Sequence, residues 1–145
     1  MSAVDRTTTH HARVIWHGDR EDLRAHTIQL ADQTLAGSSA SAFGGDPTKA
    51  DPEELFVAAL STCHMLWLLD FARRARLRVV SYEDDPEGTM SDKRVLAVVL
   101  RPRVEFEIEV SRDALDNLHR QAHAACFIAN SVTCHVTIAP PELAD

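Results

Sequence analysis

The sequence predicts an α+β fold, because strand-like segments alternate with two strongly helical segments in the order strands, helix, strands, helix, strand. Its 145 residues suit one compact globule, so we expect a single domain over residues 1–145. A hydrophobic content of 45% supplies enough apolar side chains for one core without structural disulfides.

The first helix is expected to run from Pro52 to about Arg76. Asp51-Pro-Glu-Glu provides an N-cap residue, a proline at the first helical position and a glutamate three residues after the cap. From Leu55 to Leu69 the segment is apolar nearly all round, which is typical of a helix surrounded by protein. Polar residues interrupt this run and it is too short for a membrane span, so we expect a central helix and no membrane contact.

Alternating and β-branched residues predict the strands. An early antiparallel pair is expected at Ala12–Trp16 and Arg24–Leu30, with His17-Gly18-Asp19 as the turn. The Gly- and Ser-rich segment Gly37–Gly45 is expected to be a loop. The other expected segments are strands at Leu77–Tyr82, Arg94–Val110 (with Pro102 at an edge or bend) and Val132–Ile138, and a turn-rich stretch at Asp84–Lys93.

A second helix is expected to begin after Ser111, which suits an N-cap, and to end near Asn130. One face of this helix carries apolar residues at spacings of three and four. They are Leu115, Leu118, Ala122 and Cys126. This stripe is expected to face the core.

The net charge and the expected compartment exclude some partners and some roles for the cysteines. Lys and Arg number 15 against 22 Asp and Glu, and the net charge of -7 repels a phosphate backbone, so we expect no nucleic-acid partner. The amino terminus MSAVDRTTTHHARV lacks the apolar stretch of a secretory signal, which favours the cytoplasm. In a reducing compartment, a disulfide among the three cysteines would be transient and catalytic rather than structural.

Two cysteines lie on the predicted helices, Cys63 on the first and Cys126 on the second. Packed helix axes lie about 8–10 Å apart, so two inward cysteines at one crossing could approach disulfide range. If they meet, one thiolate can attack the outer oxygen of a peroxide, and the other thiol can capture the resulting sulfenic acid as a disulfide. A buried thiol ionises poorly, so this chemistry calls for an arginine beside Cys63.

Glu53 could hold such an arginine, but it precedes Cys63 by ten residues, or about 15 Å along one helix. If both residues serve one site, Glu53 comes from a second copy of the chain, in a two-fold dimer with composite sites. Favourable electrostatics at the start of the helix explain Glu53 equally well.

Other readings stay open. Free cysteines are often inert core residues, which would make the protein a binding or structural dimer, and we expect Cys134 to be such a residue. His119, His123 and Cys126 stand at i, i+4 and i+7 on one helical face and could bind zinc with Cys63 or His64 as a fourth ligand. Packing of these histidines at a subunit interface is the alternative, and no C-x-x-C pair supports a metal.

The segment Asp51-Pro-Glu-Glu-Leu-Phe-Val-Ala-Ala-Leu-Ser-Thr-Cys63 resembles the hallmark helix of the osmotically inducible protein C (OsmC) and organic hydroperoxide resistance (Ohr) superfamily, where a Pro-Glu pair precedes the reactive cysteine by about ten residues. Ala122-His123-Ala124-Ala125-Cys126 resembles the second-cysteine segment of that superfamily. The strings CHMLW and CFIANSV resemble a less characterised branch of it, and the resemblance extends from Trp16 to Ile138.

This resemblance implies an OsmC-like fold, an intertwined homodimer in which antiparallel sheets wrap around two central helices. It implies thiol-dependent reduction of organic hydroperoxides or hydrogen peroxide, with Cys63 peroxidatic and Cys126 resolving. No cofactor and no metal are expected, and an external dithiol of lipoyl or thioredoxin type would reset the disulfide. The alkyl group of the substrate would rest on Leu66, Trp67 and Phe71.

Glu53 matches the glutamate that orients the catalytic arginine in the superfamily. Arg24, in Arg-Ala-His-Thr-Ile, resembles the arginine strand of this branch, and Arg20, after His17-Gly18-Asp19, is the second choice. Phe43-Gly44-Gly45 offers no arginine before the first helix, where another branch carries one. Phe127 stands where many members have proline after the resolving cysteine, which leaves substrate preference open.

Overall fold

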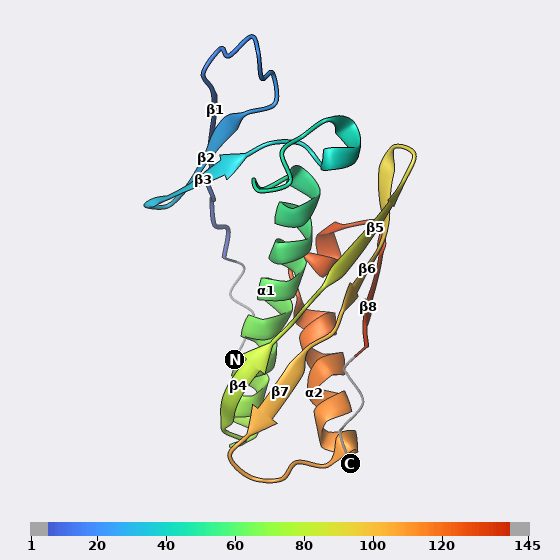
Figure 1. Cartoon of the computed structure of the whole chain (residues 1–145). Helices are drawn as coiled ribbons and strands as arrows, with labels where there is room; N and C mark the ends of the chain where they lie inside the picture. Colours follow the sequence, from blue (N-terminus) through green and yellow to red (C-terminus); the bar gives the residue numbers. More distant parts are fainter. Residues whose placement is uncertain (1–5, 140–145) are drawn as a thin grey trace. The chain divides into compact units, whose positions relative to one another are not determined.

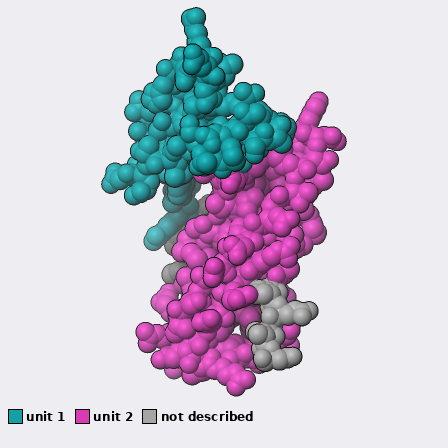
Figure 2. Space-filling model, viewed as in Figure 1, with its two compact units in different colours: residues 1–52 teal, residues 53–145 magenta. Residues whose placement is uncertain are grey.

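The computed structural model describes residues 6–139 and has the expected α+β architecture (Figure 1). The chain divides into two compact units, Met1–Pro52 and Glu53–Asp145, which Figure 2 shows in separate colours. That the whole chain is a single domain stays a prediction.

The N-terminal unit contains a three-stranded antiparallel sheet in the order β1-β2-β3. The predicted pair is confirmed as β1 (Arg13–Trp16) and β2 (His26–Leu30). The third strand, β3 (Gln33–Gly37), was not expected, and it pairs with β2 after a tight turn in which Ala31 has a φ of 54°. Glycine or asparagine usually marks such left-handed turn positions, and this turn has neither. A short 3-10 helix, η1 (Ser41–Phe43), follows in the expected loop.

Helix α1 (Pro52–Arg74) confirms the first predicted helix and ends two residues early. Arg76 adopts a left-handed φ of 60°, its backbone N–H donates to the Arg73 carbonyl, and the Leu77 N–H donates to the Ala72 carbonyl. These two bonds form a Schellman ending, which glycine usually occupies at the left-handed position. Because the sequence places arginine there, the helix end was predicted too late.

The burial of α1 follows one stripe at a spacing of four residues. The buried members are Leu60, His64, Leu68 and Ala72. Apolar residues on other faces stay open to solvent, and Leu66 is 58% exposed. The sequence predicted that protein surrounds α1. Within one chain this prediction is wrong, because faces of the helix remain open to solvent. By length and composition alone α1 could also cross a membrane, a test that core helices of soluble proteins pass as well.

The C-terminal unit carries two small sheets. In the first, β4 (Val79–Glu83) pairs antiparallel with β7 (Arg103–Phe106). In the second, β6 pairs antiparallel with β5 and parallel with β8. These strands are β5 (Glu87–Ser91), β6 (Arg94–Leu100) and β8 (His135–Ile138).

Three strand predictions needed correction. The expected strand Arg94–Val110 is broken after Leu100, where Pro102 is buried between β6 and β7 and cannot donate a ladder hydrogen bond. The segment Asp84–Lys93, expected to be a turn, contains β5, whose polar residues are all exposed. The last strand begins at His135 rather than Val132, and a 3-10 helix, η2 (Ala129–Ser131), lies shortly before it.

Helix α2 (Arg112–Ala125) confirms the second predicted helix. The Ser111 hydroxyl caps it by accepting the Ala114 N–H at 3.2 Å. The helix ends before Asn130, whose side-chain amide instead donates to the Ala124 carbonyl at 3.1 Å and so satisfies a free carbonyl of the last turn.

Two apolar clusters form the core of the C-terminal unit. The first joins α1 and α2 through Leu68, Ala72, Leu118 and Ala122. The second joins α1 and β6 through Leu60, Val98 and Leu100, and Cys134 packs against it. Cys134 thus packs partly buried against the core, as the sequence predicted, although it lies just before the last strand and not in it.

Replacing Arg76 with glycine should stabilise the protein by about 0.5–1 kcal/mol, because glycine adopts the left-handed conformation without a steric cost. Urea unfolding of Arg76→Gly would measure this gain. The neighbouring variant Ala75→Gly is the control and should lose a similar amount, since Ala75 has no positive φ. Equal destabilisation by both glycines would contradict this account of the helix end.

Candidate active site

The structure brings two thiols together in the C-terminal unit. Cys63 lies half-buried on α1, and Cys126 lies at the end of α2 with 1% of its surface exposed. Cys63 is close enough to Cys126 to contribute to the raised pKa of the Cys126 thiol, and both cysteines are free thiols. The sequence left open whether these cysteines meet, and the structure places them as neighbours where α1 packs on α2.

The surroundings of Cys126 keep it protonated. The pKa of this thiol is raised to about 11, mainly because the side chain is buried, and the neighbouring Cys63 side chain contributes to the rise. Backbone N–H groups act in the opposite direction, and that of Ala129 lies 3.5 Å from the Cys126 Sγ. Cys126 is therefore a neutral thiol at neutral pH, which suits the partner that reacts second.

A mostly apolar cavity of about 290 Å³ opens beside Cys63. It is lined by Cys63, Leu66, Trp67, Asp70 and Phe127. Asp70 is the one carboxylate in this lining, and the hydrogen bond from Arg73 is the main cause that lowers its pKa. The cavity gives the thiol an apolar neighbourhood with an ionised group at its border.

Two of the three residues expected in a substrate pocket, Leu66 and Trp67, line this cavity, and Phe71 does not. Phe71 lies one helical turn beyond Trp67, stacks on it with ring centres 5.7 Å apart, and packs against the core cluster shared by α1 and α2. Asp70 and Phe127 complete the lining instead. Sequence reasoning missed both, although Phe127 directly follows the second cysteine.

A buried pair of histidines lies in the same helix contact. His64 Nε2 and His119 Nδ1 are 2.9 Å apart, the rings are parallel within 6°, and the residues are 1% and 4% exposed. Burial, and then the charges of His119 and His123, lower the pKa of His64 to about 4. Burial also lowers the pKa of His119, against the opposing effect of Asp116 and Asp84. Both rings are therefore neutral at neutral pH, so one donates the hydrogen bond and the other accepts it.

The zinc site that the sequence suggested as an alternative, with His119, His123 and Cys126 as ligands, is wrong. His119 turns to His64, and Cys126 turns to Cys63, so the three candidates do not converge. Among residues 6–139, no group of three or more histidine, cysteine, aspartate or glutamate side chains could hold a metal ion. Helical spacing places the three residues on one face of the helix, but His119 and Cys126 contact different residues of α1.

A second polar contact ties α1 to the strands. The Ser61 hydroxyl donates to Asp84 Oδ2 at 2.5 Å, and Asp84 Oδ1 accepts the Arg101 N–H at 2.6 Å. Sequence reasoning missed this link. Its only signal was a serine one turn before His64, on the face of α1 that becomes buried.

The candidate arginines belong to the N-terminal unit. Arg24 Nε donates to the Phe43 carbonyl at 2.7 Å, and a β-carbon at Gly44 would lie 3.2 Å from the Arg24 guanidinium. Arg24 thus lies against the loop before α1, the segment that lacks an arginine of its own. Arg20 is exposed near the β1–β2 turn. The pairing of either arginine with Cys63, which belongs to the other unit, stays a prediction.

Glu53 is half-buried in the first turn of α1, and the helix runs unbroken from there past Cys63. The two residues are therefore separated by about 15 Å of helix within one chain. A site that uses both needs a second copy of the chain.

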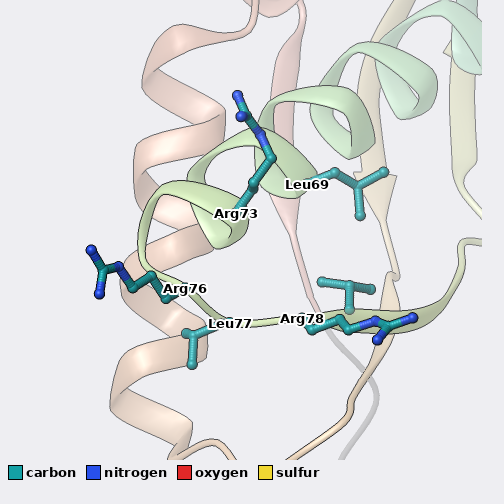
Figure 3. Close-up of a pocket in the computed structure, with 6 residues that line it drawn as sticks. Leu69, Arg73, Arg76, Leu77 and Arg78 are labelled. Carbon is teal, nitrogen blue, oxygen red and sulfur yellow. The ribbon is translucent and has the colours of Figure 1, made fainter.

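Another hollow, of about 380 Å³, lies at the carboxyl end of α1 (Figure 3). Arg73, Arg76 and Arg78 border it, and their side chains point in different directions in Figure 3. Arg73 also pairs with Asp70, and Arg78 lies 3.8 Å from Glu107. These guanidinium groups do not converge on one anion, so this hollow is not a candidate active site.

The family comparison agrees with this geometry. The model of the family described as OsmC-like protein matches residues 44–140. The chain belongs to the OsmC-like family, within the OsmC and Ohr superfamily.

Solved OsmC-like structures share its fold. An OsmC-like protein of unknown function from Vibrio cholerae is 34% identical, with a TM-score of 0.84 over 93% of this chain and 100% of that one. An organic hydroperoxide resistance protein from Legionella pneumophila is 17% identical, with a TM-score of 0.71 over 93% and 96% of the two chains. The uncharacterized protein YmaD of Bacillus subtilis is 23% identical over 130 residues, which is 85% of each chain.

The histidine pair should make stability depend on pH in a defined window. The pKa of His64 is lower in the folded chain than the ordinary 6.5, so the unfolded chain binds the proton more readily. The contribution of neutral His64 to the free energy of unfolding is fully present above about pH 6.5. It is lost as the pH falls toward 4, and the loss is on the order of 3 kcal/mol. Urea unfolding across this range should show the loss in the wild type and a smaller one in His64→Gln.

The exposed His135 provides the control, since His135→Gln should leave the pH dependence unchanged. A wild type whose free energy of unfolding does not change between pH 6.5 and 4 would contradict the buried, neutral pair.

Proposed function

We propose that this protein is a thiol-dependent peroxidase that reduces organic hydroperoxides through Cys63 and Cys126. One observation carries the proposal: a thiol that lines an apolar cavity is the neighbour of a second, buried and neutral thiol. Membership of the OsmC-like family supports a peroxide-related role, and so does the name of the Legionella neighbour.

The reaction has two chemical steps. The Cys63 thiolate attacks the outer oxygen of the hydroperoxide, so that a sulfur–oxygen bond forms, the oxygen–oxygen bond breaks, and the departing alkoxide takes a proton to become an alcohol. The Cys126 sulfur then attacks the Cys63 sulfenic acid, a disulfide forms, and hydroxide leaves with a proton as water. The peroxide is reduced by two electrons, and the two thiols are oxidised.

Each surrounding residue has a proposed role. Leu66 and Trp67 hold the apolar group of the substrate, and Arg24, or Arg20 as the second choice, stabilises the Cys63 thiolate. Glu53 holds that arginine in position. An external dithiol of lipoyl or thioredoxin type supplies the two electrons that reopen the disulfide. We place this cycle in the cytoplasm, where such dithiols are kept reduced.

The complete site is proposed to need a homodimer. Along α1, a stripe of exposed residues repeats at spacings of three or four. It comprises Ala58, Ala59 and Thr62. Small side chains let two helices approach closely, so a second α1 can cover this stripe. A two-fold pairing of this kind gives each Cys63 access to the Glu53 of the partner subunit.

Peroxide consumption tests the reaction. Reduced wild-type protein with a dithiol donor should consume cumene hydroperoxide, and Cys63→Ser should lower kcat/KM about a thousandfold because the nucleophile is lost. Cys126→Ser should complete one turnover and then stall as the sulfenic acid. Mass spectrometry should find a Cys63–Cys126 disulfide in the oxidised wild type.

The matched control is Cys134→Ser, which removes the third thiol from the core and should leave kcat/KM within about twofold. Wild-type protein that consumes neither cumene hydroperoxide nor hydrogen peroxide with any dithiol would contradict the proposal. It would favour the binding or structural dimer.

A mixed dimer tests the composite site. The Cys63→Ser and Glu53→Gln variants should each have low peroxidase activity alone. After mixing and subunit exchange, one site of each mixed dimer regains both native residues. Activity should then rise to about a quarter of the wild type, because half of the dimers are mixed and each has one complete site. Absence of any recovery after exchange, verified by mass spectrometry of the dimers, would place both residues in one chain or remove Glu53 from the site.

A further inference from the structure

Phe127 is exposed yet held in place. Its side chain is 67% exposed, but its ring meets Trp67 edge to face with centres 5.3 Å apart. The Ser131 hydroxyl donates to the Phe127 carbonyl at 2.7 Å, and the Asn130 N–H donates to the Cys126 carbonyl at 3.0 Å. The two hydrogen bonds fix the backbone next to Phe127, and the contact with Trp67 holds its ring in place although most of the ring is exposed to solvent.

The ring also belongs to the wall beside the reactive thiol. Phe127 lines the cavity of about 290 Å³ together with Cys63, Leu66 and Trp67. Leu66 and Trp67 lie on α1, whereas Phe127 follows α2, so it adds an apolar surface from a second element. A substrate carbon held between the two elements would lose contact with water on both sides.

We propose that Phe127 is a specificity-determining residue, which selects apolar hydroperoxides over hydrogen peroxide by covering the carbon group of the bound substrate. This inference rests on the proposed peroxidase function. Hydrogen peroxide has no carbon group and gains nothing from the ring. The chemical step at Cys63 is the same for both oxidants, so the ring changes their ratio and leaves the reactivity of the thiol unaltered.

The expected size follows from apolar contact. Loss of the Phe127 ring removes only part of the apolar contact with the carbon group of the substrate, because Leu66 and Trp67 still hold it. Phe127→Ala should therefore lower kcat/KM for cumene hydroperoxide about tenfold and leave that for hydrogen peroxide within about twofold. Phe127→Leu should lie between the wild type and Phe127→Ala.

Phe71→Leu is the matched control. Phe71 stacks on Trp67 at 5.7 Å but lies outside the cavity lining, so the variant disturbs Trp67 without removing the wall. The ratio of the two kcat/KM values should stay at the wild-type level. A loss equal to that of Phe127→Ala would overturn the proposal, because the effect would then come from Trp67.

A binding measurement separates this inference from the peroxidase proposal. Cumyl alcohol, the alcohol that corresponds to cumene hydroperoxide, can be titrated against the fluorescence of Trp67 in a Trp16→Phe background. Phe127→Ala should weaken its binding about tenfold, whether or not the protein reduces any peroxide. Unchanged or tighter binding, or an unchanged ratio of kcat/KM values in an active protein, would overturn the assignment.

Discussion

The packing of α1 against α2 is the contact on which the candidate site depends. Leu68 and Ala72 meet Leu118 and Ala122 in one cluster, and the two alanines are fully buried there. The same contact brings the Cys63 side chain on α1 and the Cys126 side chain at the end of α2 close to one another. A larger residue at Ala72 or Ala122 would therefore change the separation of the thiols without touching either cysteine.

Within this contact, the buried histidines restrict how the helices can pair. A buried polar group without a partner is costly, so His64 and His119 favour the one register that brings Nε2 to Nδ1. Within residues 6–139, the outer nitrogens of both rings have no hydrogen-bond partner, which leaves this mutual bond as the one that offsets their burial. The pair thus helps to align α2, and with it the Cys126 thiol, while Cys63 keeps its access to the cavity.

The sequence predicted those elements whose signals are local. Ser111 marks the start of α2, and Pro52 marks that of α1, because capping depends on residue type and position alone. The left-handed residues Ala31 and Arg76 lack the glycine that usually marks such positions, so the β2–β3 turn was missed and the end of α1 was predicted too late. The meeting of the thiols and the place of Phe127 depend on how the helices pack, which no local pattern encodes.

The composition of α1 connects these levels. Its sequence is apolar nearly all round, yet its buried residues form one stripe, and Leu66 remains 58% exposed beside the reactive thiol. A helix that evolved to face water on that side would gain solubility from charged residues there. Glu53, which is proposed to hold the arginine of the site, is also about 15 Å from Cys63 along the same helix. The proposed homodimer would account for both features, because a second α1 would cover exposed apolar residues of this helix and the partner subunit would bring its own Glu53 toward Cys63.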